Sequence, residues 1–311
     1  MKKCPKCASL MPDDVSRCIR CGFDSKPPAP VKRGRIRNGW ALARQSLRVL
    51  MLDKELLVFP LLSGIACFLV LAGFVAGAWA SGVEVREESM QDISAWVLLF
   101  VYYFANYFVI VFFNSALVAC AMIRFRGGNP TVRDGLRAAR ERLHLIAAWA
   151  LLAATVGVVL RAIEERVPLA GKIAVALLGA AWTIATYFVV PVLVVEKLGP
   201  IDAAKRSAMI LKKAWGESIV SNAGVGLITF LVTLLLALAT GVVAVMLAIS
   251  LSSLAVALAG LAAVLVLLVL GALIGSALGS IVLSALYVYA TENRLPEAFD
   301  GGQLQAAFVA K

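Results

Sequence analysis

The feature that most constrains this chain is a series of long stretches without a single Asp, Glu, Lys or Arg. They cover residues 56–83, 93–123, 143–160, 173–195 and 218–291. A helix needs about 20 residues to cross about 30 Å of hydrocarbon, at about 1.5 Å per residue. Each of the first four stretches therefore predicts one membrane-spanning helix. The third is the weakest, because it is short and Arg161 follows it at once.

The last stretch is too long for one span. Its most polar interior segment, Ile-Ser-Leu-Ser-Ser-Leu at 249–254, lies near the middle. A turn there gives two long helices and six spans in total. Three shorter helices, and thus seven spans, fit the same length.

Composition agrees with this reading of the apolar stretches. Apolar residues make up 61% of the chain and charged residues 16%, against about 45–50% and about 25% in soluble domains. The excess excludes a water-soluble enzyme. We expect an all-α polytopic membrane protein of about six transmembrane helices with cytoplasmic interfacial amphipathic helices, preceded by a small zinc ribbon.

The basic residues fall on one side of the predicted spans. Of the 30 lysines and arginines, the only ones in the loops of the other side are Arg86, Arg161, Arg166 and Lys172. Because basic loops remain in the cytoplasm, we expect a cytoplasmic N-terminus in a cell membrane, such as a prokaryotic inner membrane. An even number of spans places the C-terminus inside too. Lys2 and Lys3 lead directly to Cys4 and not to an apolar core, so no signal peptide is expected.

Three basic segments that precede the apolar pairs share one pattern. In 36–55, 131–142 and 201–215, apolar residues recur every three or four positions, opposed by basic ones, which is typical of a helix in the head-group plane. Thr131 and Asp134 have capping-box spacing, and Pro200 stands near the start of the third segment. The pattern predicts a surface helix followed by a two-span hairpin, three times. The alternative is that these loops are simply basic and partly helical.

Four of the six cysteines are clustered near the N-terminus, in two Cys-x-x-Cys pairs: Cys4, Cys7, Cys18 and Cys21. Four thiolates at this spacing close a tetrahedral shell around one structural Zn²⁺, and so short a segment depends on its metal to fold. Two disulfides are the alternative, which a reducing cytoplasm disfavours. Residues 4–22 resemble the short zinc ribbons at the ends of many prokaryotic proteins, and the resemblance implies contact with a protein or a nucleic acid. Cys67 and Cys120 are expected to be small core residues.

The chain divides into a zinc ribbon at 1–24, a linker at 25–38, a six-helix transmembrane domain at 39–291 and a cytoplasmic tail at 292–311. Prolines stiffen the linker, and its end is basic: Lys32, Arg33, Arg35 and Arg37. These cations predict attraction to anionic lipid head groups, at about 1 kcal/mol each. Nucleic acid is the less favoured partner, because no aromatic residues are interleaved with the basic ones.

Inside the spans the sequence carries amides and hydroxyls but no charged side chain. Proton-coupled transport and voltage sensing need ionisable groups at membrane depth, and the single histidine, His144, has no nucleophile motif beside it. The polar residues predict hydrogen bonds between helices, or alternatively a lipid or solute path. They are Asn106, Asn114, Thr183, Thr186, Tyr187, Asn222, Thr229 and Thr233.

Small residues at four-residue steps predict close contacts between helices. They form two stripes: Gly271, Gly275 and Gly279, and Gly73 and Gly77. The partner of the first stripe is either another helix of the chain or a second copy in a homo-oligomer. Pro191 predicts a kink in the fourth span, whose freed carbonyl must face protein or a wet cavity.

Several short sequence motifs also carry a family resemblance. They are DKELLVFP at 53–60, FFNSAL at 112–117, PVLVVE at 191–196, AAKRS at 203–207 and WGE at 215–217. With them, residues 36–290 resemble a domain-of-unknown-function family of prokaryotic six-pass membrane proteins. The resemblance implies six spans and no assigned reaction, and the zinc ribbon is an addition to it.

The sequence favours a non-enzymatic scaffold or envelope-maintenance protein whose ribbon recruits a cytoplasmic partner. A transporter, flippase or channel-like protein for lipid or small solutes is the alternative, with the polar residues as its path and Pro191 as its hinge. An enzyme is disfavoured, because no acid–base pair or nucleophile site is visible.

Overall fold

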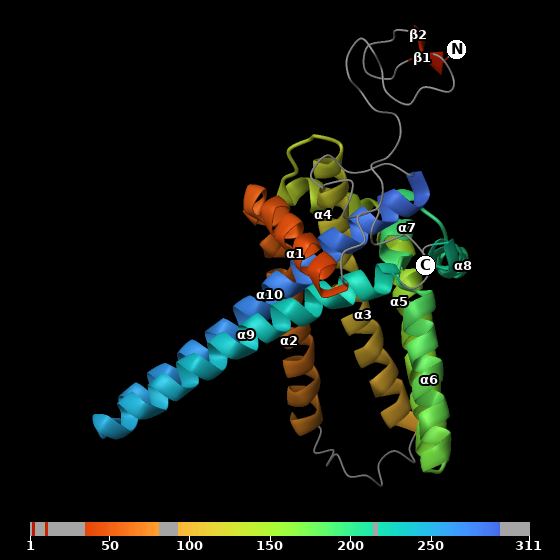
Figure 1. Ribbon diagram of the computed structural model, residues 1–311. Helices are drawn as coiled ribbons and strands as arrows, with labels where there is room; N and C mark the ends of the chain where they lie inside the picture. The colour runs from red at the N-terminus through yellow and green to blue at the C-terminus, as the bar shows by residue number, and fades with distance from the viewer. Residues whose placement is uncertain (1, 4–9, 12–34, 81–92, 214–216, 293–311) are drawn as a thin grey trace.

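The computed structural model describes residues 2–3, 10–11, 35–80, 93–213 and 217–292 (Figure 1). Two short strands near the N-terminus, β1 (Lys2–Lys3) and β2 (Leu10–Met11), pair antiparallel with Lys2 opposite Met11. Helices follow in the order α1 (Arg35–Leu52), the 3-10 helix η1 (Lys54–Leu57), α2 (Val58–Ala80), α3 (Ile93–Phe125), α4 (Val132–Glu141), α5 (Leu143–Arg166), α6 (Leu169–Ala185), α7 (Val189–Val195), α8 (Pro200–Lys213), α9 (Glu217–Ser250) and α10 (Leu254–Glu292).

Six helical stretches of the described chain are long and apolar enough to cross a membrane. They are Lys54–Ala80, Ile93–Phe125, Leu143–Arg166, Leu169–Val195, Val225–Ser250 and Leu254–Glu292. The prediction of six spans is thus confirmed, with the turn between α9 and α10 at 251–253, where the polar segment placed it. Helix α5 continues past Arg161 to Arg166, and the Arg161 guanidinium pairs within the helix with Glu164 at 3.3 Å and Glu165 at 3.0 Å.

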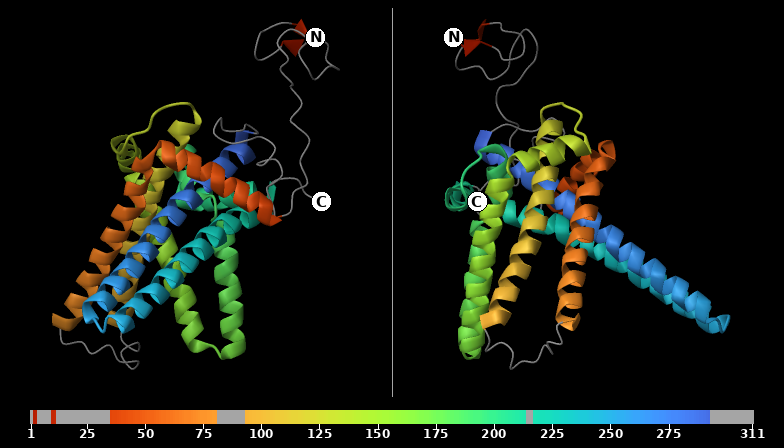
Figure 2. Two further views of the ribbon diagram at one scale, coloured as in Figure 1. Left: turned by 60° about the vertical axis from the view of Figure 1, so that its left-hand side comes forward. Right: turned by 180° about the vertical axis from the view of Figure 1, so that it is seen from behind.

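The surface helices gather at one end of the bundle, beside α7 and the C-terminal end of α10 (Figures 1 and 2). We call this end the basic face, because α4 and α8 contribute a series of cations there: Arg133, Arg137, Arg140, Lys205, Arg206 and Lys212. The chain runs α1 then α2 and α3, α4 then α5 to α7, and α8 then α9 and α10. This is the predicted order of one surface helix and one hairpin, repeated three times.

Helices α4 and α8 each pack mainly against the hairpin that comes before them in the chain. Helix α1 has no hairpin before it and packs against the last one. Helix α4 lies on α3, helix α8 lies on α6 and α7, and helix α1 lies on α9 and α10. The first unit therefore closes onto the last. Helix α3 is central, because it contacts α2, α4, α5, α7 and α10, and its buried residues run from Val111 to Phe125 near the basic face.

The α9–α10 hairpin leans away from the other spans, and its far half stands clear of them (Figures 1 and 2). Helix α9 has 34 residues and α10 has 39, so they are about 51 Å and about 58 Å long at about 1.5 Å per residue. Helices of that length fit a hydrocarbon layer of about 30 Å only when they are strongly tilted or leave the layer at one end. A lean of the hairpin is one of these two ways to fit the layer.

Candidate functional site

The polar side chains of the described chain concentrate where the surface helices meet the ends of the spans. Asp53 follows α1, and its N–H donates to the Val49 carbonyl at 3.1 Å. Its carboxylate is buried, with 5% of the side chain exposed, and accepts hydrogen bonds from Nε and Nη2 of Arg124 near the end of α3. Arg124 Nη2 also donates to Asn129 Oδ1 at 2.7 Å. A guanidinium matches a carboxylate with two parallel bonds, and this ion pair fixes the end of α1 to the end of α3.

Two carboxylates hold the first turn of α4. Asp134 Oδ2 accepts hydrogen bonds from the Thr131 hydroxyl at 2.6 Å and the Thr131 N–H at 3.0 Å, and Thr131 Oγ1 accepts from the Asp134 N–H at 3.3 Å. The predicted capping box is thus confirmed. The Thr131 hydroxyl is the main reason why the pKa of Asp134 lies below its ordinary value. Glu55 of η1 adds a long-range contact, because its Oε2 accepts from the Val132 N–H at 3.1 Å.

Gly135 brings α4 into direct contact with α2 and α3. A Cβ at this position would lie 2.6 Å from Phe59 Cζ, 2.7 Å from Cys120 Sγ and 2.8 Å from the Ala116 carbonyl oxygen. Any larger residue must push α4 away from its support. Cys120 is buried here, as expected, and its thiol donates to the Thr131 carbonyl at 3.4 Å.

A second polar cluster joins α7, α8 and α10. Glu196 follows α7, and its two carboxylate oxygens accept from Arg206 Nε of α8 at 3.0 Å and 2.9 Å. Tyr287 of α10 donates its hydroxyl to Glu196 Oε1 at 2.8 Å. One carboxylate therefore links the neighbouring helices α7 and α8 to α10, where Tyr287 is 91 residues further along the chain.

Span four breaks between α6 and α7, at residues 186–188, just before Pro191. The Val189 N–H bonds the Thr186 carbonyl at 3.0 Å, so the Ala185 carbonyl loses its usual helical partner. Ser207 of α8 replaces that partner: its hydroxyl donates to Ala185 at 2.7 Å and accepts from the Phe188 N–H at 2.9 Å. An interruption of span four is thus present three residues before Pro191, and the Ala185 carbonyl that this break frees faces protein. Pro191 itself has no N–H to donate to the carbonyl four residues before it, which is that of Tyr187.

Five of the eight polar side chains named in the spans bond a carbonyl of their own segment, contrary to the prediction of hydrogen bonds between helices. Each donates to the carbonyl four residues before it: Asn106 to Tyr102, Thr183 to Gly179, Thr186 to Trp182, Thr229 to Val225 and Thr233 to Thr229, at 2.8–2.9 Å. Short polar side chains in a helix reach that carbonyl readily, so their donors need no second helix.

The glycine stripes have different surroundings. A Cβ on Gly271 would overlap Thr233 of α9, and one on Gly275 would touch Thr229 at 3.4 Å. The first stripe therefore faces α9 of the same chain, and a homo-oligomer through it stays a prediction. Among the described residues, no atom lies within 4 Å of the position that a Cβ on Gly73 or Gly77 would take. Cys67, expected in the core, is only partly buried.

The predicted metal ligands Cys4, Cys7, Cys18 and Cys21 lie outside the described residues, so the zinc ion stays a prediction. Among the residues that are described, there is no group of three or more His, Cys, Asp or Glu side chains that could hold a metal. His144 lies exposed at the start of α5, at the basic face.

Sequence reasoning assigned no role to the residues that build the two polar clusters, although four of the six lie in the segments at 53–60, 191–196 and 203–207 that carry the family resemblance. The six are Asp53, Arg124, Glu196, Arg206, Ser207 and Tyr287. A usable signal was present, because Glu196 directly follows one apolar stretch and Asp53 lies three residues before another, on the side where basic residues are in excess. A carboxylate in that position is expected to have a cationic partner, although the sequence does not identify it.

Six apolar helices with their polar contacts at one end define the class of the protein, a multi-pass α-helical membrane protein. Residues 93–296 match a family of unknown function (DUF6159), and the chain belongs to that family. The matched segment begins with α3 and covers five of the six spans, so the DKELLVFP motif at 53–60 lies before it. A search of curated proteins finds no match.

Proposed function

We propose that the protein is a non-enzymatic membrane scaffold, with a role in maintaining the cell envelope. In this proposal the basic face lies in the cytoplasm, and the N-terminal cysteine segment, folded around Zn²⁺, recruits a cytoplasmic partner. The main support is the placement of polar contacts. The ion pairs described above tie surface helices to span ends, whereas hydroxyls at membrane depth bond their own helices.

The architecture suits a platform that presents a recruiting segment. Helix α1 begins at Arg35, so the chain from Cys21 to Arg35 reaches at most about 50 Å at about 3.3–3.6 Å per residue. A partner bound to the ribbon would stay close to the basic face. The carboxylate contacts of Asp53, Glu55 and Glu196 hold that face together. A rigid support of this kind favours precise presentation of the recruiting segment to its partner.

The recruiting role is tested with the paired substitution Cys4→Ser and Cys7→Ser in the full-length protein. We expect loss of one bound zinc per chain and loss of cross-linked cytoplasmic partners, with an unchanged thermal midpoint of the membrane part. Cys67→Ser is the matched control, because it removes a thiol from α2 and should change none of these. Retention of all partners by the zinc-free protein would contradict the proposal.

Orientation is tested separately with single cysteines introduced at positions 81, 252 and 310. An impermeant thiol reagent applied to intact cells should label 81 and 252 but not 310. Labelling at 310, or protection at both other positions, would refute the proposed topology.

A transporter or flippase is the second candidate, and the break between α6 and α7 is the observation that favours it. Asn114 of α3 is half buried, and Asn114→Leu should slow liposome flux of lipid or small solutes if the polar residues form a path. Asn106→Leu is the control, because its amide already donates to the Tyr102 carbonyl. Absence of flux for every solute and lipid class would remove this candidate.

A further inference from the structure

A groove runs along the seam between α9 and α10, below α1. It has a volume of about 440 Å³, within the range of about 300–1,000 Å³ for small-molecule sites. Arg44 and Leu47 of α1 close one end, and Leu236 and Leu270 line the other part. These two leucines are 54% and 48% exposed, so the groove opens outward.

Apart from Arg44, the side chains that line the groove offer no free donor for a polar solute. The hydroxyls of Thr229 and Thr233 line it but donate to the carbonyls of Val225 and Thr229. Gly271 brings α10 against Thr233 at the floor. The groove therefore presents an apolar surface along its length and a cation at one end.

The cation is Arg44, which is exposed at the basic face, and Arg48 lies one helical turn further along the same exposed side. Among the side chains that the structure describes, neither arginine has a carboxylate within ion-pair distance. Two uncompensated guanidinium groups beside an apolar groove complement an anionic head group joined to a hydrocarbon chain.

We propose that this groove binds one acyl chain of an anionic phospholipid, with the lipid phosphate at Arg44. The lining of α10 runs from Leu267 to Leu278, which is about 17 Å at about 1.5 Å per residue. That length matches one leaflet of a hydrocarbon layer of about 30 Å. The site rests on the proposed membrane placement and is independent of zinc and of the recruiting role.

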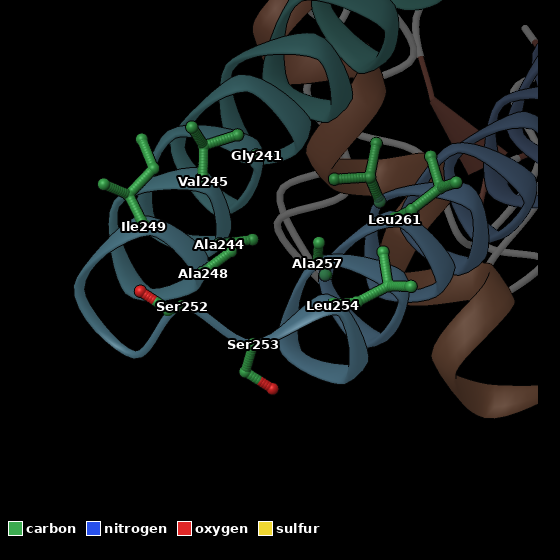
Figure 3. Close-up of a pocket in the computed structure, with 12 residues that line it drawn as sticks. Gly241, Ala244, Val245, Ala248, Ile249, Ser252, Ser253, Leu254, Ala257 and Leu261 are labelled. Atoms are coloured by element: carbon green, nitrogen blue, oxygen red, sulfur yellow. The ribbon is translucent and has the colours of Figure 1, made fainter.

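A second cavity near the tip of the hairpin serves as the comparison. It occupies about 670 Å³ between Ala244 and Ala248 of α9 and Ala257 of α10. Figure 3 shows that its polar side chains are those of Ser252 and Ser253, at the turn. With no cation in its lining, this cavity has nothing to select an anionic lipid.

The test is mass spectrometry of the intact full-length protein released from detergent, with phosphatidylglycerol and phosphatidylcholine as probes. We expect preferential retention of phosphatidylglycerol. Arg44→Gln should weaken its binding about fivefold, the equivalent of about 1 kcal/mol for one basic residue near a lipid surface. Arg140→Gln is the matched control, because it removes an exposed cation from α4, away from the groove.

A second pair of variants tests the groove itself. Leu236→Trp places a bulky indole ring in the groove and should abolish retention of phosphatidylglycerol. Leu235→Trp alters an exposed neighbour outside the lining and should leave that retention unchanged. Thermal midpoints without lipid show that each variant is folded. Equal retention of the two lipids, equal effects of Arg44→Gln and Arg140→Gln, or a dimer that excludes lipid would overturn the proposal. Zinc loss through Cys4→Ser and Cys7→Ser should leave lipid retention unchanged, so the two proposals can fail separately.

Discussion

Replacing Ser207 by alanine should destabilise the protein more than any ordinary serine substitution. The hydroxyl is fully buried and serves two backbone groups at the break in span four, the Ala185 carbonyl at 2.7 Å and the Phe188 N–H at 2.9 Å. A buried polar group left without a partner costs about 1–3 kcal/mol. With two such groups, each in the lower part of that range, Ser207→Ala should lower the free energy of unfolding by about 2–4 kcal/mol.

The assay is unfolding of the purified protein in detergent, followed by heat or by a denaturing detergent. Ser284→Ala is the matched control, because Ser284 is equally buried but its hydroxyl donates to the Ser280 carbonyl of its own helix at 2.7 Å. That carbonyl belongs to an unbroken helix, so the loss should be below about 1 kcal/mol. Equal losses for the two variants would refute the idea that Ser207 supplies the missing helical partner.

Three further predictions concern the contacts at the basic face. Arg124→Met should cost about 3–5 kcal/mol because it leaves the buried Asp53 carboxylate unpaired, and adding Asp53→Asn should recover part of the loss in a double-mutant cycle. Gly135→Ala should lower the thermal midpoint, because the added Cβ meets the Ala116 carbonyl oxygen at 2.8 Å and overpacking of this kind costs about 1–3 kcal/mol of folding free energy. An unchanged midpoint would show that α4 can shift freely. The pKa of Asp134 is lowered in the folded protein, so the stability that its ionised carboxylate contributes is fully present above about pH 4 and is lost as the pH falls through the lowered pKa. Asp134→Asn should reduce this loss of stability in acid, seen in thermal midpoints measured from about pH 3 to about pH 7.

The sequence by itself determined which segments form the long apolar helices. The number of spans, the turn at 251–253 and the capping box of α4 follow from properties of neighbouring residues. Transfer of a helix into hydrocarbon is a sum over its own side chains, and a capping box needs only residues three apart.

Tertiary structure decided which of those helices touch and through which atoms. Asp53 and Arg124 are 71 residues apart, and Glu196 and Tyr287 are 91 apart; nothing local selects one partner among many cations and hydroxyls. The prediction of hydrogen bonds between helices was wrong for Thr229 because its own helix offered a carbonyl within reach. Charge and hydropathy are properties of a segment, whereas an ion pair or a repaired helix break depends on where two distant segments meet in space.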